Sequence, residues 1–141
     1  MGLRTSTKPQ NRTRLEAVLT GAALAPATVG ASGSIGYATG AGGAVTQGTS
    51  RTTGVTLDKI TGAITLFSAA GSATPASFTV TNSTVAATDV VIPSQKSGTD
   101  KYVLLITAVA AGSFQITFYT TGGTTTEQPV FNFAVIKAVA S

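Results

Sequence analysis

The sequence predicts an all-β protein: an antiparallel β-sandwich or jelly-roll-like body that follows an extended basic N-terminal arm. From Val45 onward, short apolar or alternating runs are separated by turn residues about every 8 to 12 residues, a spacing typical of sandwiches. Only 10% of the residues are charged while threonine is abundant, as expected for a β-rich protein with a hydroxylated surface. We therefore expect residues 1–44 to form the arm and a Gly/Ala-rich connector, and residues 45–141 to form one β-sandwich domain.

The net charge of the chain is concentrated at its N-terminus. Of the nine basic residues, four lie in the first fourteen positions, and the other five balance the five acidic residues, which leaves the net charge of +4 in this segment. The segment is too polar to fold alone, and its alternatives are a solvated tail or an arm that orders on a partner surface. We favour the arm, whose contact residues are expected to be Arg4, Lys8, Arg12 and Arg14.

A short helix is predicted near residues 13–20. Thr13 and Glu16 fit a capping box, and apolar residues follow with the i, i+3, i+4 spacing of one helical face. So short a helix is marginal by itself, and its apolar face needs a surface to lie on. The rest of the connector, residues 20–44, is rich in Gly, Ala, Ser and Thr, and we expect it to be extended.

A β-hairpin is predicted at the start of the body. The five-residue turn Asp58–Gly62 lies between two β-type runs, 55–57 and 64–67, and short runs joined by a Gly-containing turn are typical of hairpins. After this hairpin, strand signals continue to the C-terminus.

Two later runs alternate between apolar and polar residues, which indicates strands with one buried face. They are residues 77–81 and 113–118. A shorter strand, residues 89–92, is expected to end at Pro93, because proline cannot donate to a strand ladder. The side chains expected to point inward are Phe78, Val80, Phe114, Ile116 and Phe118.

Two further runs, residues 102–106 and 130–136, are apolar on both faces. A strand that is apolar on both faces is usually covered on both, whereas a single sandwich covers only one. Either these are central strands overlaid by loops, or they form a subunit interface, which we favour. The residues assigned to this interface or to the core are Tyr102, Leu104, Ile106, Phe131, Phe133 and Val135.

The residue types present argue against an enzyme. The chain contains no His and no Cys, which excludes disulfides, His or Cys metal sites and His-based acid–base catalysis. The glycines of residues 40–43 lack the GK[ST] ending of a phosphate-binding loop. Asp58, Asp89 and Asp100 lack the spacing of a calcium loop, and we expect solvated turn residues. No apolar run approaches the roughly 18 residues of a membrane span. We predict no catalytic residue, no cofactor and no metal.

A set of segments between roughly residues 35 and 138 carries a resemblance to a known module. The segments are Tyr37, the glycines at 40, 42 and 43, residues 45–47, 49–51 and 53–59, Gly62, residues 64–65, 78–83, 110–114 and 132–137. Together they resemble a module of small structural proteins of tailed phages and prophages, of the head decoration (cement) type. The resemblance implies a role in a virion and carries no catalytic residue.

This resemblance implies a capsid decoration protein that binds the outside of a phage head shell and stabilises it. The expected partner is the major capsid protein, the expected oligomer is a homotrimer, and the expected location is the capsid surface. The alternative is a tail-fibre or appendage receptor-binding module whose loops bind a cell-surface glycan. Nucleic-acid binding is disfavoured, because the arm's cations have no aromatic residues among them and the first aromatic residue is Tyr37.

Overall fold

The computed structural model describes residues 27–29 and 35–138, and it divides the chain into two units, residues 1–39 and 40–141. In the first unit, β1 (Ala27–Val29) pairs antiparallel with β2 (Ile35–Tyr37). The predicted extended connector therefore contains a two-stranded ladder. The basic arm and the predicted helix lie outside the described residues.

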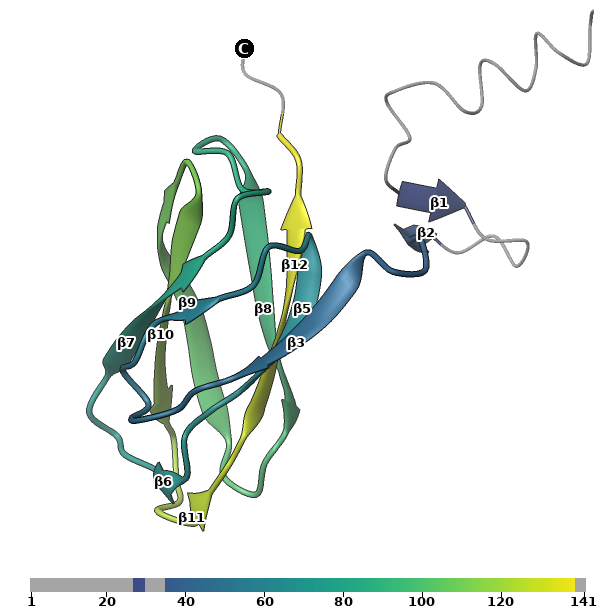
Figure 1. The fold of residues 1–141 in the computed structure, drawn as a ribbon. Helices are drawn as coiled ribbons and strands as arrows, with labels where there is room; N and C mark the ends of the chain where they lie inside the picture. Colours follow the sequence, from purple (N-terminus) through teal and green to yellow (C-terminus); the bar gives the residue numbers. More distant parts are fainter. Residues whose placement is uncertain (1–26, 30–34, 139–141) are drawn as a thin grey trace, which may run out of the picture. The chain divides into compact units, whose positions relative to one another are not determined.

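The second unit is a sandwich of two four-stranded sheets, which confirms the predicted all-β sandwich-like fold (Figure 1). The described residues contain no helix. We name each large sheet after its central strand. The β10 sheet has the order β4 (Val55–Thr56), β7 (Ala76–Thr81), β10 (Ser113–Thr120), β9 (Tyr102–Ala110). The β12 sheet has the order β3 (Gly42–Thr46), β5 (Thr61–Thr65), β12 (Val130–Ile136), β8 (Val90–Ser97). A two-stranded ladder joins β6 (Ala69–Ala70) to β11 (Thr126–Glu127).

The sheets are antiparallel except at one edge of each, where β3 runs parallel to β5 and β4 runs parallel to β7. Among the described strands, the sandwich therefore departs from the expected antiparallel pairing at these two edges only. Because β3 begins at Gly42, it also straddles the expected boundary between residues 44 and 45.

The predicted hairpin is wrong, because its two runs belong to different sheets. The Leu57 N–H donates to the Thr81 carbonyl at 3.0 Å, which keeps this residue with the β10 sheet. Three residues later, the Ile60 carbonyl accepts from the Val135 N–H at 2.8 Å and so belongs to the β12 sheet. The short turn between them changes sheets instead of returning along the same one.

The core lies between the two large sheets and is rich in phenylalanine. The predicted inward side chains of β7 and β10 are all buried, as the alternation indicated. Phe118 contacts rings from both sheets, with its centroid 5.9 Å from that of Phe78 and 5.6 Å from that of Phe131. Phe114 and Phe133 meet in the same way at 5.0 Å. Tilted and edge-on ring pairs of this kind stabilise a core beyond the area that they bury.

Pro93 does not end its strand, contrary to the prediction. β8 continues through it to Ser97, and Pro93 stands opposite Phe133 in the ladder. β8 has a hydrogen-bonded neighbour on one side only, and an edge strand tolerates proline because the missing N–H can face away from the ladder.

Candidate interaction surface

A buried arginine, Arg51, organises the end of the sandwich where β6 and β11 lie. Its side chain is 8% exposed, and each of its five N–H bonds donates to a protein oxygen. Four of the acceptors are backbone carbonyls, so the guanidinium holds the β6–β11 ladder against the body and has no donor left for a ligand. The acceptors are the carbonyls of Phe67, Ala69, Ala70 and Glu127 and the Tyr102 hydroxyl.

Two carboxylates complete this end of the molecule. Glu127 accepts backbone N–H bonds from Thr99 and, at 3.0 Å, from Asp100. Burial alone would raise the pKa of Glu127, but these backbone donors hold the pKa below its ordinary value. Asp100 is 4% exposed and accepts the Thr125 N–H at 2.9 Å. The expectation that Asp100 is solvated is wrong, because its carboxylate is buried and accepts a hydrogen bond from the backbone of Thr125.

A second buried carboxylate, Asp89, holds the opposite end of β12. It accepts the Ala86 N–H at 2.8 Å and forms an ion pair with Lys137, whose ammonium also donates to the Thr84 carbonyl at 2.7 Å. Desolvation raises the pKa of Asp89, but these donors lower it further than burial raises it. Asp89 is 6% exposed, so the prediction of a solvated turn residue is wrong here too, while Asp58 is exposed as expected.

These buried polar groups hold loops through hydrogen bonds to the backbone. In the described part of the chain, every buried side-chain nitrogen and oxygen has a hydrogen-bond partner. No cluster of three or more acidic, His or Cys side chains that could hold a metal occurs within residues 27–29 and 35–138. The same residues include no helix long and apolar enough to cross a membrane.

Three large apolar side chains gather at one end of the outward face of the β12 sheet. Val90, Ile92 and Ile136 are 52%, 50% and 51% exposed. In the ladder between β8 and β12, Ile136 stands opposite Val90, and Ala134 stands opposite Ile92. Opposed residues on one face have Cβ atoms about 4.5–5.5 Å apart, so these side chains form one cluster. We call Val90, Ile92, Ala134 and Ile136 the apolar patch.

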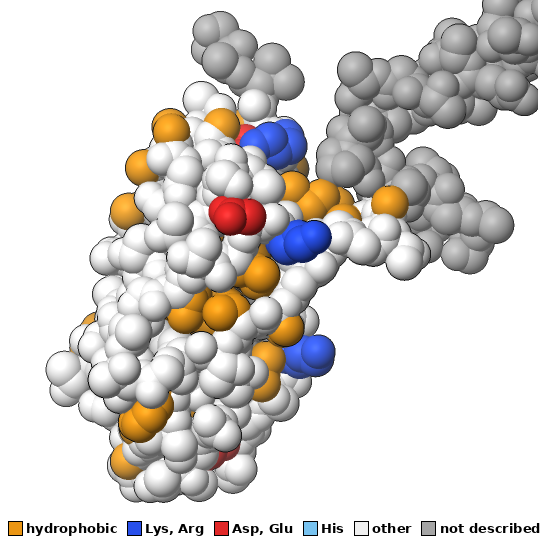
Figure 2. Space-filling model, viewed as in Figure 1, with side chains coloured by type: hydrophobic (Ala, Val, Ile, Leu, Met, Phe, Trp, Pro, Cys, Tyr) orange, Lys and Arg blue, Asp and Glu red, His pale blue; other side chains and the backbone are white. Residues whose placement is uncertain are grey.

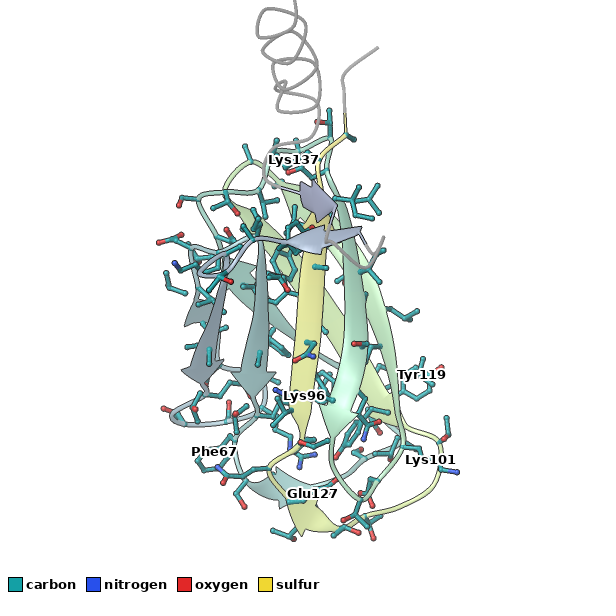
Figure 3. All side chains as sticks on the ribbon, turned by 90° about the vertical axis from the view of Figure 1, so that its right-hand side faces the viewer. Phe67, Lys96, Lys101, Tyr119, Glu127 and Lys137 are labelled. Carbon is teal, nitrogen blue, oxygen red and sulfur yellow. The ribbon has the colours of Figure 1, made fainter. Side chains whose placement is uncertain are left out.

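The rest of this face is small and uncharged. Burial alternates along β12, and the ladders from β12 to β5 and from β5 to β3 carry this alternation across the sheet. The side chains of β3, β5 and β12 that face outward are uncharged. On β8 the charged residue is Lys96, which is exposed. Figure 3 views this sheet from outside, with Lys137 at the end where the apolar patch lies and Lys96 farther along. In Figure 2 most of the visible surface is uncharged, and the basic side chains lie along one side.

The outward face of the β10 sheet has a different chemistry. A chain of hydrogen bonds runs across three strands, from Ser77 to Thr117 at 2.7 Å, from Thr117 to Thr107 at 2.8 Å, and from Thr107 to the Gln115 side-chain carbonyl at 2.8 Å. Leu105, 47% exposed, is an exposed large apolar residue on this face. The two faces of the sandwich are thus unequal: one is hydroxylated and the other carries the apolar patch.

The residues predicted for a core or interface separate into two groups. Those of β12 are fully buried between the sheets, whereas those of β9 are half-buried and pack against the core from an edge strand. β9 is therefore not a central strand. The buried group is Phe131, Phe133 and Val135, and the half-buried group is Tyr102, Leu104 and Ile106. The four basic contact residues predicted in the arm lie outside the described residues.

Sequence reasoning missed the apolar patch, although a signal was present. Val90, Val91 and Ile92 are consecutive, so this run is apolar on both faces in the same way as residues 130–136. Treating Pro93 as the end of a short strand concealed that β8 is a full partner of β12.

No protein-family model matches the chain, and neither a curated protein nor a solved structure matches it. A functional proposal therefore depends on the residues and geometry above and on the resemblance in the sequence.

Proposed function

We propose that this chain is a virion structural protein, a decoration (cement) protein that binds the outside of a tailed-phage head shell and stabilises it. The observation that carries the proposal is the apolar patch. Three half-exposed large aliphatic side chains in one cluster would each contribute on the order of 1 kcal/mol when covered. Clusters of this kind mark protein contact sites more often than scattered apolar residues do.

The rest of the molecule fits a protein that acts by binding and not by catalysis. The buried Arg51, Asp89 and Asp100 tie loops to the body, so the sandwich presents its faces on a firm support. A contact surface built on strands is held more precisely than one built on loops.

In this proposal the protein stabilises the shell by mass action. A ligand that binds only the assembled shell stabilises it by about 2.7 kcal/mol at a free concentration one hundred times its Kd. The partner is the major capsid protein, and the body is part of a homotrimer on the capsid surface. The cations Arg4, Lys8, Arg12 and Arg14 steer the arm to acidic shell surfaces, and a second point of attachment raises the effective concentration of the first.

One observation favours the alternative, a receptor-binding module of a tail fibre or appendage. The hydroxylated face of the β10 sheet is uncharged and carries Leu105, a composition that suits a neutral glycan, whose rings have both hydroxyl groups and apolar faces. Binding of the protein to a glycan array, lost on Thr117→Lys and kept on Ile92→Lys, would support this alternative.

The proposed function is tested by co-sedimentation with empty heads of the encoding phage or prophage from which this protein has been removed. We expect saturable binding of the full chain, a higher melting temperature of the heads, and weaker binding of a chain that lacks residues 2–14. Absence of binding by the folded full chain would overturn the proposal.

A further inference from the structure

We infer that one end of the sandwich is an acid-sensitive cap, which opens in acid while the two large sheets stay folded. We call this part, residues 68–72, 98–101 and 121–128, the polar cap, and it includes the β6–β11 ladder. The inference goes beyond the proposed function, since it concerns the isolated protein and holds whether or not that protein binds a shell.

The polar cap has little apolar packing of its own. The described core residues, and the half-buried apolar residues packed against them, all lie outside its three ranges. The apolar side chains within the cap are those of Ala69 and Ala70, and its ladder is two residue pairs long. Segments with few buried apolar contacts open locally at a lower free energy than the whole domain does. The cap is therefore held mainly by hydrogen bonds.

Glu127 joins the three segments of the polar cap. Its backbone pairs with Ala69 in the ladder, and its carboxylate accepts the N–H groups of Thr99 and, at 3.0 Å, of Asp100. The same carboxylate accepts the Tyr102 hydroxyl of β9 at 3.3 Å. Figure 3 shows Glu127 at this end of the molecule, with Phe67 and Lys101 to either side. Because hydrogen bonds to an ionised carboxylate are the stronger ones, protonation of Glu127 weakens all three side-chain contacts at once.

Arg51 makes the cap depend on negative charge in a second way. Its buried guanidinium donates to the ladder carbonyls of Ala69, Ala70 and Glu127, and to the Tyr102 hydroxyl that contacts the Glu127 carboxylate. A buried cation whose nearby anion is removed carries an uncompensated desolvation penalty. Once the Glu127 carboxylate is neutral, the guanidinium favours an open cap in which water reaches it.

A second carboxylate in the cap acts in the same direction. Asp100 is buried and accepts the Thr125 N–H at 2.9 Å, so its protonation weakens a bond between the 98–101 and 121–128 segments. Burial raises the pKa of Tyr102, whose hydroxyl therefore stays protonated in acid. The cations of this region, Arg51 and the exposed Lys96 and Lys101, keep their charge throughout an acid titration.

The pH window follows from Glu127. Desolvation raises its pKa, but the backbone bonds from Thr99 and Asp100 and the Tyr102 hydroxyl hold the pKa below the ordinary value of 4.5. A lowered pKa contributes stability that is present above the unfolded value and is lost as the pH falls through the folded one. We therefore expect opening to begin below about pH 4.5.

Amide hydrogen exchange at neutral pH tests the inference, with Glu127→Gln as a nearly isosteric substitute for the protonated side chain. The amides of Gly71 and Thr125 are the probes, because their acceptors are the Thr125 carbonyl and the Asp100 carboxylate and not Glu127 itself. Both should exchange at least about tenfold faster in the variant, while the amides of the central strand β10 exchange as in the parent chain.

Asp58→Asn is the matched control. Asp58 is exposed, accepts the Ser83 N–H at 2.7 Å, and precedes β5, whose first residue pairs with Ala134 near the far end of β12. This variant should leave the exchange of Gly71 and Thr125 unchanged. Equal exchange at these two amides in Glu127→Gln and in the parent chain would overturn the inference.

An acid titration of the unmodified full chain, followed by amide NMR signals from about pH 7 to about pH 3, tests the inference without any substitution. The signals of the polar cap should lose their dispersion at a higher pH than those of β10 do. Cap and β10 signals that change together at one pH would overturn the inference. A Glu127→Gln chain that unfolds as a whole would also overturn it, because the cap would then not open separately from the sheets.

Discussion

At the scale of single residues, the clearest expectation concerns Phe133. Its ring is 2% exposed and packs on Phe114. Phe133→Asp would place an unpaired carboxylate in the core and should cost more than about 4 kcal/mol, a large part of the stability of a domain of this size. Thermal unfolding followed by circular dichroism should show a protein that is unfolded or strongly destabilised. A variant that melts normally would remove Phe133 from the core.

Two adjacent glycines offer a matched comparison. Gly123 has a φ of +129°, and a Cβ built there would lie 2.3 Å from Oδ1 of Asp100, whereas a Cβ at Gly122 would meet nothing within 4 Å. Gly123→Ala should therefore destabilise the protein by at least about 2 kcal/mol, and Gly122→Ala should change stability by less than about 0.5 kcal/mol. Urea unfolding measures both, and equal midpoints for the two variants would contradict the close packing around Asp100.

Two hydrogen-bonded carboxylates predict how stability depends on pH. Asp89 and Glu127 have ordinary pKa values of 3.8 and 4.5, and the folded protein lowers the pKa of each. A group with a lowered pKa contributes stability that is present above its unfolded pKa and is lost as the pH falls through its folded pKa. The urea midpoint should therefore decrease from about pH 4.5 downward.

The control for this prediction is the double variant Asp89→Asn, Glu127→Gln, in which the two side chains can no longer titrate. It should be less stable at neutral pH and should show a flatter acid dependence than the parent protein. A parent midpoint that is the same at pH 3 and pH 7 would mean that these carboxylates contribute nothing to stability.

At the scale of elements, local sequence patterns predicted where the strands lie better than they predicted which strands pair. The alternation of residues 77–81 and 113–118 was enough to assign the inward phenylalanines, because a strand with one buried face repeats every two residues. The placement of β4 and β5 in different sheets was not predictable from this alternation. It depends on Leu57 and Ile60 bonding to opposite sheets, and sheet membership is a long-range property that a turn sequence does not encode.

The burial of polar side chains was likewise not predictable from local sequence patterns. Asp89 and Asp100 occur in turn-like segments, where a carboxylate is ordinarily solvated. Each is buried because distant segments supply donors: Lys137 reaches Asp89 across 48 positions, and Thr125 reaches Asp100 across 25. The apolar patch was within reach of the sequence, since the run from Val90 to Ile92 is apolar on both faces.

At the scale of the whole molecule, the second unit has a hydrophobic core among the described residues. Its buried apolar residues all lie between Val55 and Val135. A chain lacking residues 2–14 should therefore unfold at the same temperature as the full chain, while its binding to heads decreases. A lower melting temperature of the truncated chain would make those residues part of the folded core.

The position of β12 also determines how the protein would respond to mechanical load. β12 is the last strand described, and it is paired with β5 over five residues and with β8 over seven. Lys137, directly after it, is held by Asp89. A tensile force applied at Lys137 would pull this strand along its own axis and shear two ladders at once. The load would thus be borne by a strand that is paired on both sides.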